Sequence, residues 1–157
     1  MSNINRGKQF EQQIREAFEK VPGCSVDRLP DQMSGFAGSS NICDLMVYKY
    51  PKLFYIECKS CYGNTLNFGN ITEKQWSGLM EKAEIYGCIP GIIVWFIDHD
   101  RTVFITIWEL IYHKSRGFKS INVKDLGDEW TAYDIPGKKK RILFDYDMTN
   151  FFGRWNK

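Results

Sequence analysis

Three charged residues, Asp44, Glu57 and Lys59, have the types and spacing of a metal-dependent catalytic site. Asp44 opens one run of β-forming residues, and Glu57 and Lys59 lie inside the next, with a turn around Pro51 between the runs. Two carboxylates directly opposite each other on one face of a sheet repel, and a divalent cation between them removes that cost. Oxygen ligands suit Mg²⁺ or Mn²⁺. A lysine beside such an ion can orient a water or stabilise negative charge that develops on a phosphate.

The register of the predicted hairpin decides whether the two carboxylates meet. Pairing Tyr48 with Leu53 across the turn places the two carboxylates opposite each other. The alternation of a strand then puts Lys59 on the same face as Glu57 and Cys58 on the other face. The alternative is a solvated edge-strand face. Apolar neighbours in both runs make unpaired charges costly there, which favours the metal site.

The composition indicates a soluble, intracellular globular protein. The chain has 157 residues, enough for a single domain over residues 1–157 with a sizeable core. Hydrophobic residues make up 43% and no apolar run reaches membrane-spanning length, so we expect neither disorder nor a membrane partner. The five cysteines favour reduced thiols in the cytoplasm over a disulfide framework. A zinc site at Cys58 and Cys61 is the weaker alternative, because no second Cys pair accompanies them.

The formal net charge of +2 is unevenly distributed along the chain. Residues 114–157 carry a basic surplus, whereas residues 1–113 carry an acidic one. The densest basic cluster consists of Lys138, Lys139, Lys140 and Arg141. Such a run can follow the phosphates of a nucleic acid, and a solvated turn is the alternative.

The periodicity of apolar residues predicts an α/β fold. Helical spacing covers residues 5–20 and 72–86, and a shorter helical piece covers residues 108–113. The predicted strands are residues 24–29, 44–48, 53–59, 91–97, 102–107 and 141–145. Loops rich in small polar residues and Gly are expected at residues 30–41 and 62–70. This order of elements predicts a mixed β-sheet flanked by helices.

Four short motifs stand out: Asn-Arg-Gly-Lys-Gln-Phe-Glu at residues 5–11, Ser-Ser-Asn-Ile-Cys-Asp at residues 39–44, Glu-Cys-Lys at residues 57–59, and Gln75. Together with the order of elements, they resemble the PD-(D/E)xK nuclease superfamily and, within it, RecU-type Holliday junction resolvases and their phage relatives. The resemblance implies a restriction-endonuclease-like core over about residues 5–110. Residues 114–157 would then form a basic C-terminal extension.

The resemblance also implies a role for each residue of the metal hairpin. Asp44 and Glu57 would bind Mg²⁺ or Mn²⁺, with the backbone carbonyl of Cys58 as a further ligand. Lys59 would stabilise the transition state or position the attacking water.

Two accessory residues, Gln75 and Glu11, are implied by the resemblance but have a simpler explanation as well. Gln75 would contact the metal through a water, yet it also stands at capping-box spacing from Thr72. Glu11 would approach the site from the first helix, yet it could equally be a solvated carboxylate favoured by the helix dipole. Residues 98–100, Asp-His-Asp, have metal-ligand types, but a charged turn explains them better.

The favoured function is a Mg²⁺-dependent, structure-selective DNA endonuclease that resolves Holliday junctions as a homodimer, with a phage origin in a bacterial host as the expectation. The alternatives are a sequence-specific or end-processing nuclease of the same fold, and a catalytically silent DNA-binding or virion-associated module. RecU-type proteins carry a long basic stalk before the catalytic Asp. Residues 30–41 carry no basic residue, so residues 138–141 become the candidate surface for binding branched DNA.

Overall fold

The computed structural model describes residues 3–30 and 41–155. The predicted loop at residues 31–40 lies outside them. The elements in chain order are α1 (Asn3–Glu19), β1 (Cys24–Arg28), β2 (Leu45–Lys49), β3 (Lys52–Cys61), β4 (Thr65–Asn67), η1 (Phe68–Asn70), α2 (Glu73–Ala83), β5 (Cys88–Phe96), η2 (Ile97–His99), β6 (Arg101–Thr106), α3 (Ile107–Ser115), β7 (Ser120–Asn122), η3 (Val123–Asp125), β8 (Tyr133–Asp134), β9 (Gly137–Lys140), β10 (Leu143–Tyr146) and η4 (Gly153–Trp155).

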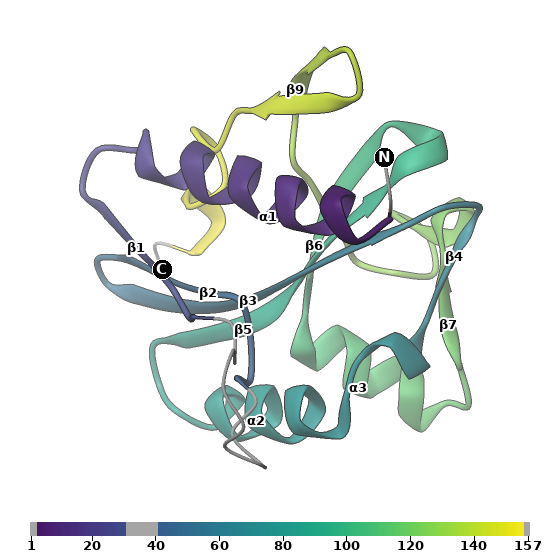
Figure 1. Ribbon diagram of the computed structural model, residues 1–157. Helices are drawn as coiled ribbons and strands as arrows, with labels where there is room; N and C mark the ends of the chain where they lie inside the picture. The colour runs from purple at the N-terminus through teal and green to yellow at the C-terminus, as the bar shows by residue number, and fades with distance from the viewer. Residues whose placement is uncertain (1–2, 31–40, 156–157) are drawn as a thin grey trace.

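Within the described residues, six strands form the central sheet in the order β1-β2-β3-β5-β6-β8. The strands β3 and β5 pair in parallel, and the other neighbours pair antiparallel. The connection between the two parallel strands includes α2, as a parallel pair requires. The predicted mixed sheet flanked by helices is therefore confirmed (Figure 1).

Two apolar layers cover the two faces of this sheet. The helix α1, the strand β10 and the C-terminal residues pack on one face, and α2 and α3 pack on the other (Figure 1). Along β5 the side chains alternate between the layers, with Ile93 and Trp95 in the first and Ile92 and Val94 in the second. The strand β5 is thus buried on both sides, which is typical of a strand in a parallel pair.

The first helix lies on the sheet because Phe10, Ile14 and Phe18 recur at helical spacing and are buried together. The chain leaves the helix at Pro22 and Gly23, and Gly23 has a positive φ of 75°. Among the described helices none is long and apolar enough to cross a membrane.

Several predicted boundaries need correction. The strand expected at residues 141–145 begins only at Leu143, because Arg141 adopts a left-handed conformation (φ 59°) and forms a turn with Ile142. The helix expected at residues 72–86 ends at Ala83. The stretch at residues 62–70 is not only loop, since β4 lies in it and pairs with β7.

Candidate active site

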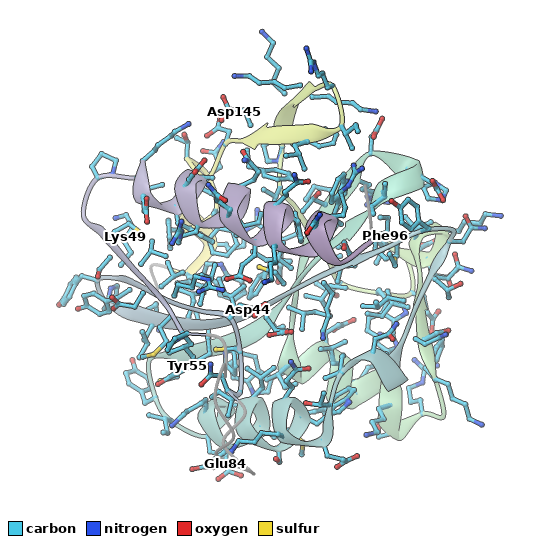
Figure 2. The ribbon with its side chains drawn as sticks, in the orientation of Figure 1. Asp44, Lys49, Tyr55, Glu84, Phe96 and Asp145 are labelled. Carbon is cyan, nitrogen blue, oxygen red and sulfur yellow. The ribbon has the colours of Figure 1, made fainter. Side chains whose placement is uncertain are left out.

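The hairpin of β2 and β3 has the predicted register. Tyr48 faces Leu53, which places Asp44, the residue before β2, opposite Glu57. The backbone N–H of Asp44 donates to the carbonyl of Ile56 (3.1 Å), one residue off the strand register, so the ladder becomes irregular where it reaches the site. Figure 2 shows Asp44 near the middle of the molecule, beside α1. The sequence pattern therefore predicted how the two carboxylates meet.

The Asp44 carboxylate is held by the backbone of the facing strand. The N–H of Cys58 donates to its Oδ2 at 2.8 Å. The Cys58 side chain points away from the carboxylates into the apolar layer under α1, as strand alternation predicts. This backbone donor was not anticipated from the sequence, because only the register of the hairpin places it.

Glu57 lies at the centre of the polar contacts. Its side chain is 6% exposed, and its Oε2 accepts from Lys59 Nζ at 3.1 Å and from Gln75 Nε2 at 2.9 Å. Lys59 comes from the same strand and Gln75 from the first turn of α2, so two elements converge on one carboxylate oxygen. A buried carboxylate with two donors is fixed in place, which is the preorganisation that a catalytic site needs.

The two carboxylates perturb each other. Burial, followed by the nearby charge of Glu57, raises the pKa of Asp44 from 3.8 to about 7. Burial also raises the pKa of Glu57, although Lys59 opposes that rise. Both raised pKa values mean that the positive charge of Lys59 does not fully offset the burial and mutual repulsion of the two carboxylates. Perturbed carboxylates of this kind are typical of functional sites.

The chemistry of this donor set fits a hard divalent cation. Mg²⁺ commonly binds through one or two carboxylates and keeps several waters, and a charge of +2 would remove the repulsion within the pair. No group of three or more His, Cys, Asp or Glu side chains is close enough to form a metal cage in the described ranges 3–30 and 41–155. Two carboxylates with a neighbouring carbonyl suit a partly hydrated Mg²⁺ or Mn²⁺ better than a fully protein-bound ion.

Gln75 both caps the start of α2 and contacts Glu57. Its Oε1 accepts from the N–H of Thr72 at 3.0 Å while the Thr72 hydroxyl accepts from the N–H of Gln75, forming a complete capping box. The other end of the same amide donates to Glu57. The expected contact with a metal-bound water stays a prediction.

Glu11 approaches the site from α1, on the side of Arg28. Its carboxylate accepts from Arg28 Nε at 2.7 Å, and its side chain is only 12% exposed. Burial raises the pKa of Glu57 first, and the negative charge of Glu11 adds to that rise, so the two carboxylates are within electrostatic range. A fully solvated Glu11 is therefore wrong. The sequence analysis did not identify Arg28 as a residue of the site. Its position at the end of β1, the strand that pairs with β2, is the signal that could have indicated it.

The Asp-His-Asp turn at residues 98–100 is structural. Asp98 accepts from the N–H of Gly63 at 2.6 Å, and His99 Nε2 lies 2.7 Å from Asn64 Oδ1. Asp100 pairs with Lys139 at 3.0 Å. The charged-turn explanation is confirmed. All five cysteines are free thiols.

The basic cluster at residues 138–141 lies apart from the β2–β3 hairpin (Figure 1). It forms β9 and the turn to β10, and all four side chains are exposed. The structure thus separates the residues predicted for chemistry from those predicted for DNA binding.

A mixed sheet flanked by helices, with an Asp and a Glu-x-Lys element on adjacent strands, is the architecture of the restriction-endonuclease-like nucleases. The chain belongs to the family of archaeal Holliday junction resolvases (Hjc), whose family model matches residues 2–130. The resemblance to Holliday junction resolvases is confirmed at this level. The match extends beyond the expected core at about residues 5–110 and ends before β8.

A solved structure supports the same fold. The Holliday junction resolvase Hjc of the archaeal hyperthermophile Archaeoglobus fulgidus superposes with a TM-score of 0.54, at 18% sequence identity, over 75% of this chain and 89% of the archaeal chain. No curated protein sequence matches the chain.

Proposed function

We propose that the chain is a Mg²⁺- or Mn²⁺-dependent endodeoxyribonuclease that resolves Holliday junctions by phosphodiester hydrolysis. The observation that carries the proposal is the pair of facing carboxylates: Glu57 is buried and accepts from Lys59 and Gln75, and Asp44 is half-buried opposite it. Family membership supports the substrate class. A finer kinship to the RecU-type resolvases remains a prediction, supported by the motifs at residues 5–11 and 57–59.

Each residue has a role that its surroundings allow. Asp44 and Glu57 would hold the cation, with the Cys58 carbonyl as a further ligand and Gln75 on its water shell. A cation held there would supply an activated water and would neutralise charge on the phosphate. Lys59, fixed by Glu57, presents its ammonium to negative charge that develops on the phosphate.

Glu11 completes the proposed site from the side of α1. Its carboxylate is within electrostatic range of Glu57 and is held by Arg28. It would accept a hydrogen bond from a water beside the scissile phosphate, and Arg28 would hold it in position.

A cleavage assay separates this function from its alternatives. Purified protein with Mg²⁺ or Mn²⁺ is incubated with a four-way junction, a Y-fork and a linear duplex of the same sequence. We expect paired cuts in the four-way junction and little cutting of the duplex. Sequence-dependent cutting of the duplex would indicate another nuclease of this fold, and binding without any cutting would indicate a silent module.

We further propose that the working unit is a homodimer. Resolution needs two cuts, and the described part of the chain offers one pair of carboxylates of this kind. The surface that fits a second copy lies at the end of α2 and the start of α3, where Ile85 (50%), Tyr86 (96%) and Trp108 (44%) are exposed. They line a groove of about 460 Å³ that also includes Trp155. Exposed aromatic residues around a groove are typical of protein interfaces.

Sedimentation velocity tests this surface directly. Tyr86→Glu combined with Trp108→Glu places charges in the groove, and we expect a shift from dimer to monomer. Tyr48→Glu is a control on another exposed tyrosine. A monomeric wild-type protein, or a double variant that stays dimeric, would contradict this interface.

A further inference from the structure

The hairpin of β9 and β10 is built onto the sheet outside the region that the family model matches, which ends at residue 130. It is a fixed part of the fold. Phe144 and Tyr146 of β10 belong to the apolar layer under α1, and the Tyr146 hydroxyl lies 2.8 Å from that of Thr102. Figure 1 shows β9 projecting beyond α1 at the edge of the molecule.

The inner face of the hairpin is structural. Gly137 faces Tyr146, and a Cβ at Gly137 would lie 3.0 Å from the tyrosine ring, so the hairpin packs tightly there. Lys139 faces Phe144 on the same side and reaches Asp100 at the turn before β6, at 3.0 Å. Lys139 therefore ties the hairpin to the sheet.

The outer face carries an unbalanced positive charge. Lys138 faces Asp145 across the hairpin, but Asp145 instead contacts Lys20 of α1 (3.2 Å) and Lys140 (3.6 Å). Neither Lys138 nor Arg141 has an ion-pair partner among residues 3–30 and 41–155. The carboxylate of Asp145 thus pairs with two basic side chains. An anion from outside the chain would balance the positive charge that remains on this face.

Arg141 is unusual for its position in the turn. Its φ of 59° is left-handed, where Gly or Asn is less strained. The two-residue turn between Lys140 and Leu143 accounts for this φ, because tight hairpin turns place their first central residue in the left-handed region. The turn leaves the Arg141 side chain exposed at the tip of the hairpin.

The helix α1 connects this face to the candidate active site. Glu11 is within electrostatic range of Glu57 and lies next to Phe10, whose ring contacts Tyr146 of the hairpin. Lys20, at the other end of the helix, contacts Asp145. From residue 11 to its end at Glu19, the helix spans about 12 Å, or between about three and four base-pair steps.

We propose that the outer face of the β9–β10 hairpin binds backbone phosphates of the DNA arm that flanks the cut, through Lys138, Lys140 and Arg141, whereas Lys139 is a structural tie. The inference rests on the proposed function, because it assumes a DNA substrate. It deepens that function by assigning the grip on the arm to a hairpin outside the family match.

The salt dependence of binding tests the proposal without any cleavage. A labelled four-way junction is titrated with protein in EDTA at several salt concentrations between 50 and 200 mM, and a gel verifies that the DNA stays intact. The variant is Lys138→Gln with Arg141→Gln. Two lost phosphate contacts should lower the slope of log affinity against log salt by about 1.8. Between the two salt limits, wild-type affinity should then fall on the order of tenfold more than that of the variant.

Matched controls keep this test specific. Lys119→Gln with Lys124→Gln removes the same charge from exposed positions near β7, and Lys139→Gln removes the structural tie; we expect both to keep the wild-type slope. An unchanged slope in the hairpin variant, or an equal change in the β7 control, would overturn the inference and leave the nuclease function standing. If the wild-type protein does not bind the junction at all, the proposed function fails first.

Discussion

Gln75 links the start of α2 to Glu57 through the two ends of one amide. Its Oε1 accepts from the N–H of Thr72 at 3.0 Å, and its Nε2 donates to Glu57 Oε2 at 2.9 Å. The sequence had suggested that the capping role of Gln75 and its contact with the candidate site are alternatives. In the structure, one side chain makes both contacts. Fixing the helix also fixes Glu57, the carboxylate that we propose as a metal ligand.

This relationship predicts that Gln75→Ala loses both stability and activity, whereas Thr72→Ala loses stability alone. Thr72→Ala removes only the hydroxyl acceptor, which costs about 1 kcal/mol of unfolding free energy, and leaves the backbone N–H that orients Gln75. Thermal unfolding and single-turnover cleavage of a four-way junction measure the two effects. Equal specific activity in wild type and Gln75→Ala would show that the Glu57 contact does not matter.

For Lys59→Ala we expect the cleavage rate to fall far more than the affinity for DNA. A preorganised charge at a developing oxyanion contributes about 3–4 kcal/mol, or more than a hundredfold in rate. Single-turnover rates at saturating protein, with the Kd measured in EDTA, separate these quantities. If rate and affinity fall equally, Lys59 positions the phosphate and does not stabilise the transition state.

The pH dependence of stability tests the carboxylate pair in the metal-free protein. The pKa of Asp44 is about 7 in the folded chain and about 3.8 ordinarily. The stability linked to a raised pKa is fully present below pH 4 and is lost as the pH rises through 7. Wild type should therefore lose more unfolding free energy between pH 4 and 8 than Asp44→Asn does. Parallel denaturation profiles for the two proteins would contradict the coupled, buried pair.

Two glycines in helices should respond oppositely to alanine. A Cβ at Gly78 in α2 would clash with the Ile42 side chain, two residues before Asp44, whereas a Cβ at Gly7 in α1 meets nothing within 4 Å. Gly78→Ala should destabilise by about 1–3 kcal/mol and slow cleavage by displacing the segment before β2. Gly7→Ala should stabilise by up to about 1 kcal/mol. Chemical denaturation of both variants measures the signs, and stabilisation by Gly78→Ala would contradict this packing.

Features that depend on neighbouring residues were accessible from the sequence. The register of β2 and β3 follows from a short turn at Pro51 and from strand alternation, so the meeting of Asp44 with Glu57 could be predicted. The start of α2 follows from the local spacing of Thr72 and Gln75. In each case the relevant contacts span few residues and leave a periodic pattern.

Features that depend on distant packing were not accessible. Phe151 and Phe152 close the aromatic layer against Phe18 and Phe54, and no local pattern connects segments so far apart. The contact of Arg28 with Glu11 likewise exists only because α1 and β1 lie side by side. The tie between Lys139 and Asp100 separates one lysine from its neighbours in a run that looks uniform in the sequence.

The most direct test of the account is the single-turnover rate at which Asp44→Asn protein cuts a four-way junction in saturating Mg²⁺. The substitution removes one of the two facing carboxylates with little change in size. Asp27→Asn, at an exposed carboxylate on β1, is the matched control. We predict that Asp44→Asn abolishes cleavage while binding of the junction in EDTA persists, and that Asp27→Asn cuts at the wild-type rate. Cleavage by Asp44→Asn at the wild-type rate would contradict a metal site at Asp44 and Glu57.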